Sequence, residues 1–241
     1  IEAQFHLGEI YDEGLGVAQD FSVAVTWYRR AADQGFAAAQ NNLGWMYKQG
    51  KGGVAQDFRE AARWFRLSAN AGNADGQFSL GQLYDHGEGV EQDYQQALQW
   101  YRLAAEQNHL HAQTWLGLMY EYGKGIQENP IEAFKWYRKA AARGDIDAQI
   151  YLAMLYEQGK GVQVNYAEAA KWFRKAADQG NTYAQVNLAL LYKDGKGLAQ
   201  DYQAALEWYR KAADQGDTEA RNALEKLQND LKKPARALGG N

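Results

Sequence analysis

The strongest constraint on this 241-residue chain is a motif that returns six times at an almost constant interval. Its most visible member is a tryptophan, with a spacing of 36 residues between copies and one spacing of 37. The series is Trp27, Trp64, Trp100, Trp136, Trp172 and Trp208. A fixed interval of this size is typical of solenoids, in which each repeat buries its apolar face against its neighbours. The chain is therefore predicted to be an array of repeats.

The repeat at residues 146–181 shows that each unit specifies two helices. The apolar face of the first helix has the spacing of an α-helix and consists of Ala148, Leu152, Leu155 and Tyr156. Gly159 is expected to end this helix, because glycine adopts a positive φ at little cost. Asn165 is expected to cap the second helix, with Glu168 as its reciprocal capping-box partner. Gly180 then ends the second helix.

The same positions recur along the chain. The predicted N-caps of the second helices are Asp20, Asp57, Asp93, Asn129, Asn165 and Asp201. The predicted left-handed helix ends are Gly35, Gly72, Asn108, Gly144, Gly180 and Gly216. Small residues that would let the two helices approach closely are Gly8, Gly44, Gly81, Gly117, Ala153 and Ala189. Gly53 is one extra residue in the second repeat, so its loop is expected to bulge.

These positions resemble the Sel1-like repeat family, a relative of the tetratricopeptide repeats, and Ala3 through Gly35 carries its pattern nearly complete. The resemblance implies an all-α, right-handed superhelical solenoid of antiparallel helix pairs with a concave inner face. We expect repeats at 1–36, 37–73, 74–109, 110–145, 146–181 and 182–217. A capping helix at 218–232 and a disordered tail at 233–241 would follow. The absence of cysteine excludes the disulfide-bearing branch of the family.

Composition argues against most other functions. The net charge is −4 with both signs interleaved, which gives no reason to expect a nucleic-acid partner. No apolar run is long enough for membrane insertion. Residues with catalytic or metal-ligating side chains are scattered, the four histidines are expected to be solvent-exposed, and Gly-x-Gly lacks the preceding strand of a phosphate loop. We therefore predict no enzyme activity, no catalytic residue, no metal and no cofactor.

An arginine series on the second helices admits two interpretations. It consists of Arg29, Arg66, Arg102, Arg138, Arg174 and Arg210. It could form a basic stripe for nucleic acid or lipid head groups. The favoured interpretation is a solvated outer face with partners such as Asp178 and Asp214, four residues away on the same helix.

The predicted binding site lies on the first helix of each repeat. In tetratricopeptide units the second, fifth, ninth, twelfth and thirteenth residues face inward, and that face carries aromatic and aliphatic side chains here. The candidates are His86, Leu118, Tyr122, Met154, Tyr183 and Leu190, with Trp45 and Trp115 as the tryptophans outside the framework series. Leu118, Met154 and Leu190 occupy one repeat position and would form an apolar strip. Exposed aromatic residues and Met beside polar residues are typical of protein-binding surfaces.

Two alternatives remain open for these residues. Superhelical curvature could bury them as ordinary core, which is the expectation for the fifth position. Trp45, Leu118 and Met154 are expected to be exposed, and Tyr122 and Tyr183 fit either interpretation. The predicted function is that of a scaffold or adaptor with a protein or peptide in its groove. The alternative is an immunity protein that neutralises a bacterial toxin. The resemblance further implies a bacterial effector or host protein as partner, and a periplasmic or secreted location over a cytoplasmic one.

Overall fold

The computed structural model describes residues 1–232, and the predicted tail at 233–241 lies outside the described residues. The described part is all-α and divides into two units, Ile1–Asn129 and Pro130–Asn241. The first unit contains α1 (Glu2–Glu13), α2 (Phe21–Ala32), α3 (Ala37–Gln49), α4 (Phe58–Asn70), α5 (Ala74–His86), α6 (Tyr94–Glu106) and α7 (Leu110–Tyr122). The second contains α8 (Pro130–Ala142), α9 (Ile146–Gln158), α10 (Tyr166–Asp178), α11 (Thr182–Asp194), α12 (Tyr202–Asp214) and α13 (Thr218–Lys232).

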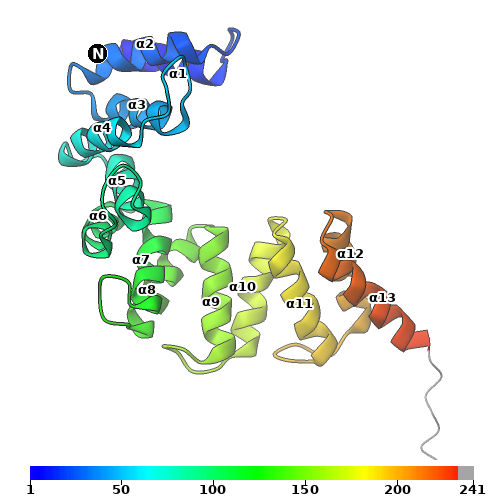
Figure 1. The fold of residues 1–241 in the computed structure, drawn as a ribbon. Coiled ribbons are helices and arrows are strands. Elements are labelled where there is room, and N and C mark those ends of the chain that lie inside the picture. Colours follow the sequence, from blue (N-terminus) through cyan, green and yellow to red (C-terminus); the bar gives the residue numbers. More distant parts are fainter. Residues whose placement is uncertain (233–241) are drawn as a thin grey trace, which may run out of the picture. The chain divides into compact units, whose positions relative to one another are not determined.

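Within each unit, every helix packs against the helices before and after it in the chain (Figure 1). The odd-numbered helices, the first of each repeat, are called A helices below. The even-numbered helices are called B helices. In the first unit α3 also contacts α5 directly, so these A helices form a continuous layer. Stacking of each pair on its neighbour is the solenoid architecture predicted from the repeat.

The predicted helix boundaries have the expected chemistry. Asp20, Asp57, Asp93, Asn165 and Asp201 each accept hydrogen bonds from backbone N–H groups in the first turn of a B helix. Asn108, with φ of 64°, is the only described residue other than glycine with a positive φ. It confirms that asparagine replaces glycine at this helix end.

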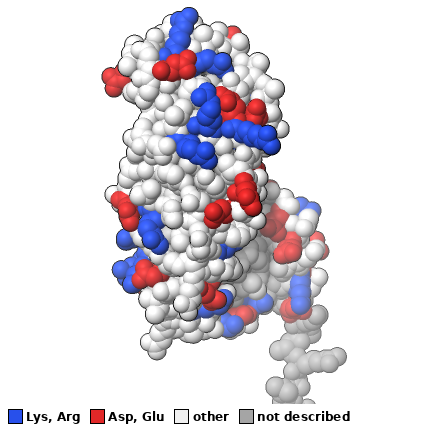
Figure 2. Space-filling model, turned by 60° about the vertical axis from the view of Figure 1, so that its left-hand side comes forward, with Lys and Arg blue, Asp and Glu red and all other residues white. Residues whose placement is uncertain are grey.

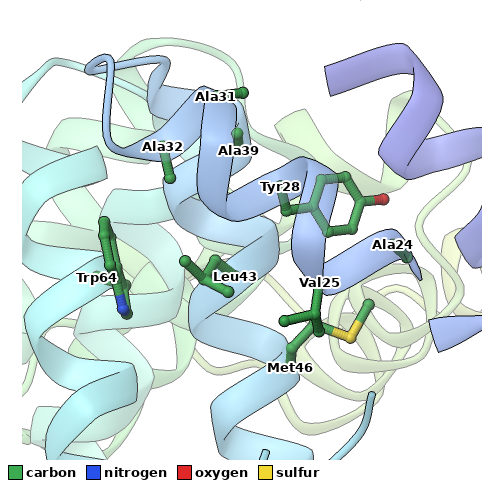
Figure 3. Packing of buried hydrophobic residues seen from close by; sticks show 9 residues of the cluster. All are labelled: Ala24, Val25, Tyr28, Ala31, Ala32, Ala39, Leu43, Met46 and Trp64. Carbon is green, nitrogen blue, oxygen red and sulfur yellow. The ribbon is translucent and has the colours of Figure 1, made fainter. Parts of the chain in front are cut away.

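The core is built from rings of the B helices packed against small residues of the A helices. Tyr28, Phe65, Tyr101, Tyr137, Phe173 and Tyr209 are all buried. A Cβ added to Gly44 would lie 2.6 Å from the ring of Phe65, so glycine is required for this close approach. Around Tyr28, alanines alternate with Val25, Leu43 and Met46 (Figure 3).

Half of the predicted capping box is present: the Asn165 side chain accepts from the Glu168 N–H at 3.0 Å, but the Glu168 side chain does not return the bond. The Asn165 N–H donates to the carbonyl of Tyr156 at 2.8 Å, and the Glu168 carboxylate pairs with Lys171. The same bond joins each B-helix cap to the tyrosine carbonyl of the preceding A helix. The pairs are Asp20–Tyr11, Asp57–Tyr47, Asp93–Tyr84, Asn129–Tyr120, Asn165–Tyr156 and Asp201–Tyr192. The bond survives the extra residue Gly53, which the loop accommodates with positive φ at both Gly52 and Gly53.

The arginine series has a different partner from the one expected. The guanidinium groups donate to tyrosine hydroxyls of the next repeat, in the pairs Arg29–Tyr47, Arg66–Tyr84, Arg102–Tyr120 and Arg174–Tyr192. These bonds tie a B helix to the following A helix. The series therefore contributes to the joint between repeats.

A glutamine ladder provides another joint. Buried glutamines at the fourth repeat position donate to the last carbonyls of the preceding B helix, in the pairs Gln40–Ala32, Gln77–Ala69, Gln113–Ala105, Gln149–Ala141 and Gln185–Ala177. Glutamines after the B helices donate to the side-chain oxygen of this position, in the pairs Gln34–Gln4, Gln107–Gln77, Gln179–Gln149 and Gln215–Gln185. Carbonyls at the ends of B helices are thus satisfied.

Candidate functional site

The candidate surface lies on the A helices and is named here the A-face. It is defined by repeat positions two, nine, twelve and thirteen. The fifth position belongs to the core in three repeats, because Asn41, Thr114 and Ile150 are buried. The second and thirteenth positions are the most open, and they place His86, Tyr122 and Tyr183 in solvent. Each unit contributes its own part of the A-face.

Trp45 is half-buried and held in a fixed orientation. Its indole N–H donates to the hydroxyl of Ser79 at 3.1 Å, and that hydroxyl donates to Asn41 at 3.0 Å. Its ring meets the edge of Phe65 with centroids 5.7 Å apart. Trp45 is thus anchored to the core by one edge and contributes only part of its ring to the A-face.

His86, Trp115 and Tyr122 supply the aromatic character of α5 and α7. The ring of His86 packs edge-on against the half-buried ring of Trp115, with centroids 5.9 Å apart. The Trp115 ring also packs against the ring of Tyr101, with centroids 5.8 Å apart. The Tyr101 hydroxyl donates to buried Asp85, and burial together with the Asp85 charge raises the pKa of Tyr101 far above its usual range. Tyr122 has 61% of its surface exposed. Leu118, on the same helix, is half-buried.

Met154, Tyr183 and Leu190 form the corresponding part of the second unit. The Tyr183 hydroxyl lies 3.9 Å from the sulfur of Met154, so α9 and α11 are joined here. Tyr183 is 50% exposed and Leu190 is 37% exposed, whereas Met154 is half-buried. Of the three residues of the predicted apolar strip, Met154 on α9 and Leu190 on α11 lie in this unit. Leu118 belongs to the other unit.

His109 contradicts the expectation that all histidines are solvent-exposed. Its Nδ1 accepts from the Ala112 N–H at 3.1 Å, so the imidazole caps α7. Its Nε2 lies 3.2 Å from Asp75, and its ring stacks on Phe78 at 4.7 Å. The hydrogen bond to His109 lowers the pKa of Asp75. The repeat position of His109 could have predicted this capping role. At the equivalent position Asn73, Asp145 and Asn181 cap other A helices.

Within residues 1–232, no three side chains of metal-ligating type are grouped so that they could hold an ion. None of the helices α1–α13 has the length and apolarity needed to cross a membrane. On the face shown in Figure 2, Lys and Arg are interleaved with Asp and Glu between wide areas without charge. That pattern suits contacts of mixed polarity.

The tandem helix pairs, turn glycines and shared joints described above define one repeat type. The family model for the Sel1 repeat matches residues 1–36, 37–73, 74–109, 110–145, 146–181 and 182–217. The chain belongs to the Sel1 repeat family. Sel1-repeat solenoids are typical protein-interaction scaffolds. Among curated proteins, none matches this chain.

Solved Sel1-repeat structures share the fold. This chain is 41% identical to c5321, a protective antigen present in uropathogenic Escherichia coli strains, with a TM-score of 0.87 over 100% of this chain and 50% of that one. It is 36% identical to a Sel1 repeat protein from Oxalobacter formigenes, with a TM-score of 0.78 over 88% of this chain and 84% of that one. The chain thus spans half the length of c5321.

The immunity protein Pa5087 from Pseudomonas aeruginosa is more distant. It has 19% identity and a TM-score of 0.54 over 99% of this chain and 90% of that one. At this identity the likeness shows the Sel1-repeat fold alone.

Proposed function

We propose that this Sel1-repeat chain is a non-catalytic scaffold or adaptor that binds a protein or peptide in its groove, along the A-face. The observation that supports the proposal is the exposure of large aromatic side chains there. Tyr122 and Tyr183 are 61% and 50% exposed, whereas the framework rings Tyr28, Tyr101, Tyr137 and Tyr209 are buried. Packing of the solenoid does not require a ring at these two positions, since other repeats have Gln49 or Asp147 there.

The A-face has the composition of a recognition surface. Tyrosine and tryptophan provide large contact area with few rotatable bonds, and they are enriched among residues that dominate binding energy. Here they stand on helices locked by caps and ladders, so little side-chain entropy is lost on binding. Neighbouring polar residues such as His86, Gln158 and Asp194 would set specificity and association rate.

The test uses the exposed candidates first, because Trp45, Leu118 and Met154 are half-buried and their removal also weakens the fold. We would compare affinity capture by the wild-type chain with capture by the triple variant Tyr122→Ser, Tyr183→Ser, Leu190→Ser. The matched control is Leu67→Ser, Leu103→Ser, Ile131→Ser, which removes exposed apolar residues from B helices. We expect one stoichiometric partner to be lost only from the A-face variant. A partner kept by that variant, with both variants folded by circular dichroism, contradicts the proposal.

Affinity separates the adaptor from its main alternative. An immunity protein that neutralises a toxin is expected to bind one folded enzyme with Kd near 1 nM, whereas an adaptor that binds peptides is expected nearer 1 μM. The likeness to Pseudomonas aeruginosa immunity proteins lies at 19–20% identity and does not favour inhibition. The adaptor therefore remains the proposed function.

A further inference from the structure

A small hollow opens on the A-face of the first unit, between α1 and α3. Its volume is about 300 Å³, which suits one side chain rather than a whole ligand. Its lining residues are Asp12, Asn42, Trp45, Met46, Gln49 and Lys51. The wall thus combines a carboxylate, an indole ring, a buried thioether and two amides.

The carboxylate in this wall is held in place and is not neutralised. One oxygen of Asp12 accepts from the hydroxyl of buried Tyr28 at 3.0 Å. Burial, reinforced by the charges of Asp12 and Glu9, raises the pKa of Tyr28, so the hydroxyl remains a donor. Among the described residues no Lys or Arg nitrogen lies within 4.0 Å of Asp12. Helix α1 carries four carboxylates and neither Lys nor Arg, so the field on this side is negative.

Each of the two lysines near the hollow has contacts other than Asp12. Lys51 lines the hollow, but its ammonium lies 4.9 Å from the ring centroid of Phe21. Lys48 forms an ion pair with Glu88 at 2.8 Å, and its ammonium lies 5.1 Å from the ring centroid of Trp45. This second contact shows that the Trp45 ring accepts a cation in this environment.

The combination of a carboxylate with an aromatic ring is special to this junction. By repeat phase, position twelve of one repeat is followed across the junction by position nine of the next. The successive pairs are Asp12 with Trp45, Lys48 with Gln82, Asp85 with Leu118, Glu121 with Met154, and Glu157 with Leu190. The first pair alone offers a negative charge and a π-face, the two features that recognise a cationic side chain.

We infer that the hollow formed by Asp12 and Trp45 receives a lysine or arginine side chain from the protein partner. The inference rests on the proposed function and narrows the partner to one that presents a basic side chain to the first two repeats. The aliphatic stem of that side chain would lie along Met46 and the indole, while its charged end reaches Asp12. The amide of Gln49 lines the same hollow and would offer its carbonyl oxygen to the N–H groups of that side chain, whereas the Asn42 oxygen already accepts from Asn41 at 3.5 Å.

The probe is a blocked Gly-Arg-Gly tripeptide, compared with the same peptide carrying neutral citrulline instead of arginine. Binding to the full chain is followed by NMR through the indole N–H signal of Trp45. We expect the arginine peptide to shift this signal saturably and less strongly at high salt. Asp12→Asn keeps an acceptor for Tyr28 and should weaken binding by about three- to fivefold, the size of one partly exposed ion pair.

The matched control is Glu157→Gln, which removes a carboxylate from the same repeat position in the fifth repeat. This variant should bind the arginine peptide as the wild-type chain does. Equal binding of the citrulline peptide, or unchanged binding to Asp12→Asn, overturns the inference. The inference is also overturned if a natural partner is lost from the A-face variant but contacts Asp12 with no basic residue. That outcome leaves the proposed function intact. Conversely, arginine-peptide binding without any A-face partner supports the hollow and counts against the proposed function.

Discussion

At the residue scale, the fourth position of the A helix shows what the repeat pattern concealed. A glutamine at this position predicts a side chain on the helix surface, yet Gln40, Gln77 and Gln149 are buried. Each side chain donates to a carbonyl at the end of the preceding B helix, and Gln77 and Gln149 also accept from a second glutamine. The second contact joins residues 30 apart in sequence, so it becomes visible only when the two helices of one repeat are placed together.

Two rungs of this ladder are missing, at Gln40 and at Gln113. Gln40 has a buried side-chain oxygen without a partner, because Ala71 stands where Gln34, Gln107, Gln179 and Gln215 stand in other repeats. Ala71 is exposed and has φ of −78° and ψ of 3°, close to the values at Gln107. Ala71→Gln is therefore expected to raise the free energy of unfolding by about 1 kcal/mol through the new hydrogen bond. Urea denaturation measures the change.

Two variants control for a general effect of glutamine at this helix end. Asn70→Gln places the same side chain one residue earlier and is expected to have little effect. In a Gln40→Met background, Ala71→Gln should no longer stabilise, since the acceptor is gone. Equal stabilisation in both backgrounds would show that the ladder is not the cause.

The contact between Asp75 and His109 predicts a pH dependence. The hydrogen bond to His109 lowers the pKa of Asp75 in the folded state below its ordinary value of 3.8. The contribution of Asp75 to stability is therefore fully present above that value and is lost as the pH falls through the folded-state pKa. We expect the stability difference between wild type and Asp75→Asn in urea denaturation to shrink on acidification below the ordinary value. A difference that grows there would contradict this sign.

At the element scale, the turn between A and B helices explains why Gly-x-Gly recurs. The first glycine ends the A helix with positive φ, as predicted. The second also has positive φ, and its backbone lies against the carbonyl at the start of the preceding B helix. The second glycines in this contact are Gly52, Gly89, Gly125, Gly161 and Gly197.

This turn offers a matched pair of variants. Gly16 and Gly125 have φ of 75° and 67°, but an added Cβ meets nothing within 4 Å at Gly16 and overlaps the Tyr94 carbonyl at Gly125. Gly16→Ala is expected to cost about 1–2 kcal/mol, the strain of left-handed backbone. Gly125→Ala should cost about 1–3 kcal/mol more from overpacking. Thermal denaturation of the two variants compares their losses of stability. Equal losses would mean that the backbone around Tyr94 moves to accommodate the added Cβ without cost.

The sequence predicted the elements well because their signals are local. The Asp and Asn caps and Asn108 each act within one turn of helix, and the Trp spacing marks the length of each repeat. Partners between repeats were harder to predict. Arg174 pairs with Tyr192 rather than with Asp178, which requires knowing how one repeat rests on the next. The A-face candidates were named from repeat phase, but the extent to which Trp45 or Met154 sinks into the surface depends on neighbouring helices.

At the scale of the whole molecule, most contacts between helices join consecutive ones, so stability should be a sum of repeats and their joints. Tyr209 of α12 is buried, and the pKa of its hydroxyl is raised to about 12 mainly by burial. Tyr209→Ala removes a core ring and is expected to cost about 3–5 kcal/mol locally. In a globular domain such a loss would lower the protection of every core amide from hydrogen exchange.

In this chain the effect is expected to remain near the sixth repeat. Amides of α11, α12 and α13 should exchange faster in Tyr209→Ala, while those of α1–α6 keep their wild-type rates, because the helices that pack closely against α12 are α11 and α13. Hydrogen exchange read by mass spectrometry resolves the segments. Tyr202→Ala is the control, since this side chain of α12 is 38% exposed and its loss leaves the core filled. Faster exchange throughout the chain would instead show that the array unfolds as one cooperative body, so that a partner bound at one end could stabilise the other.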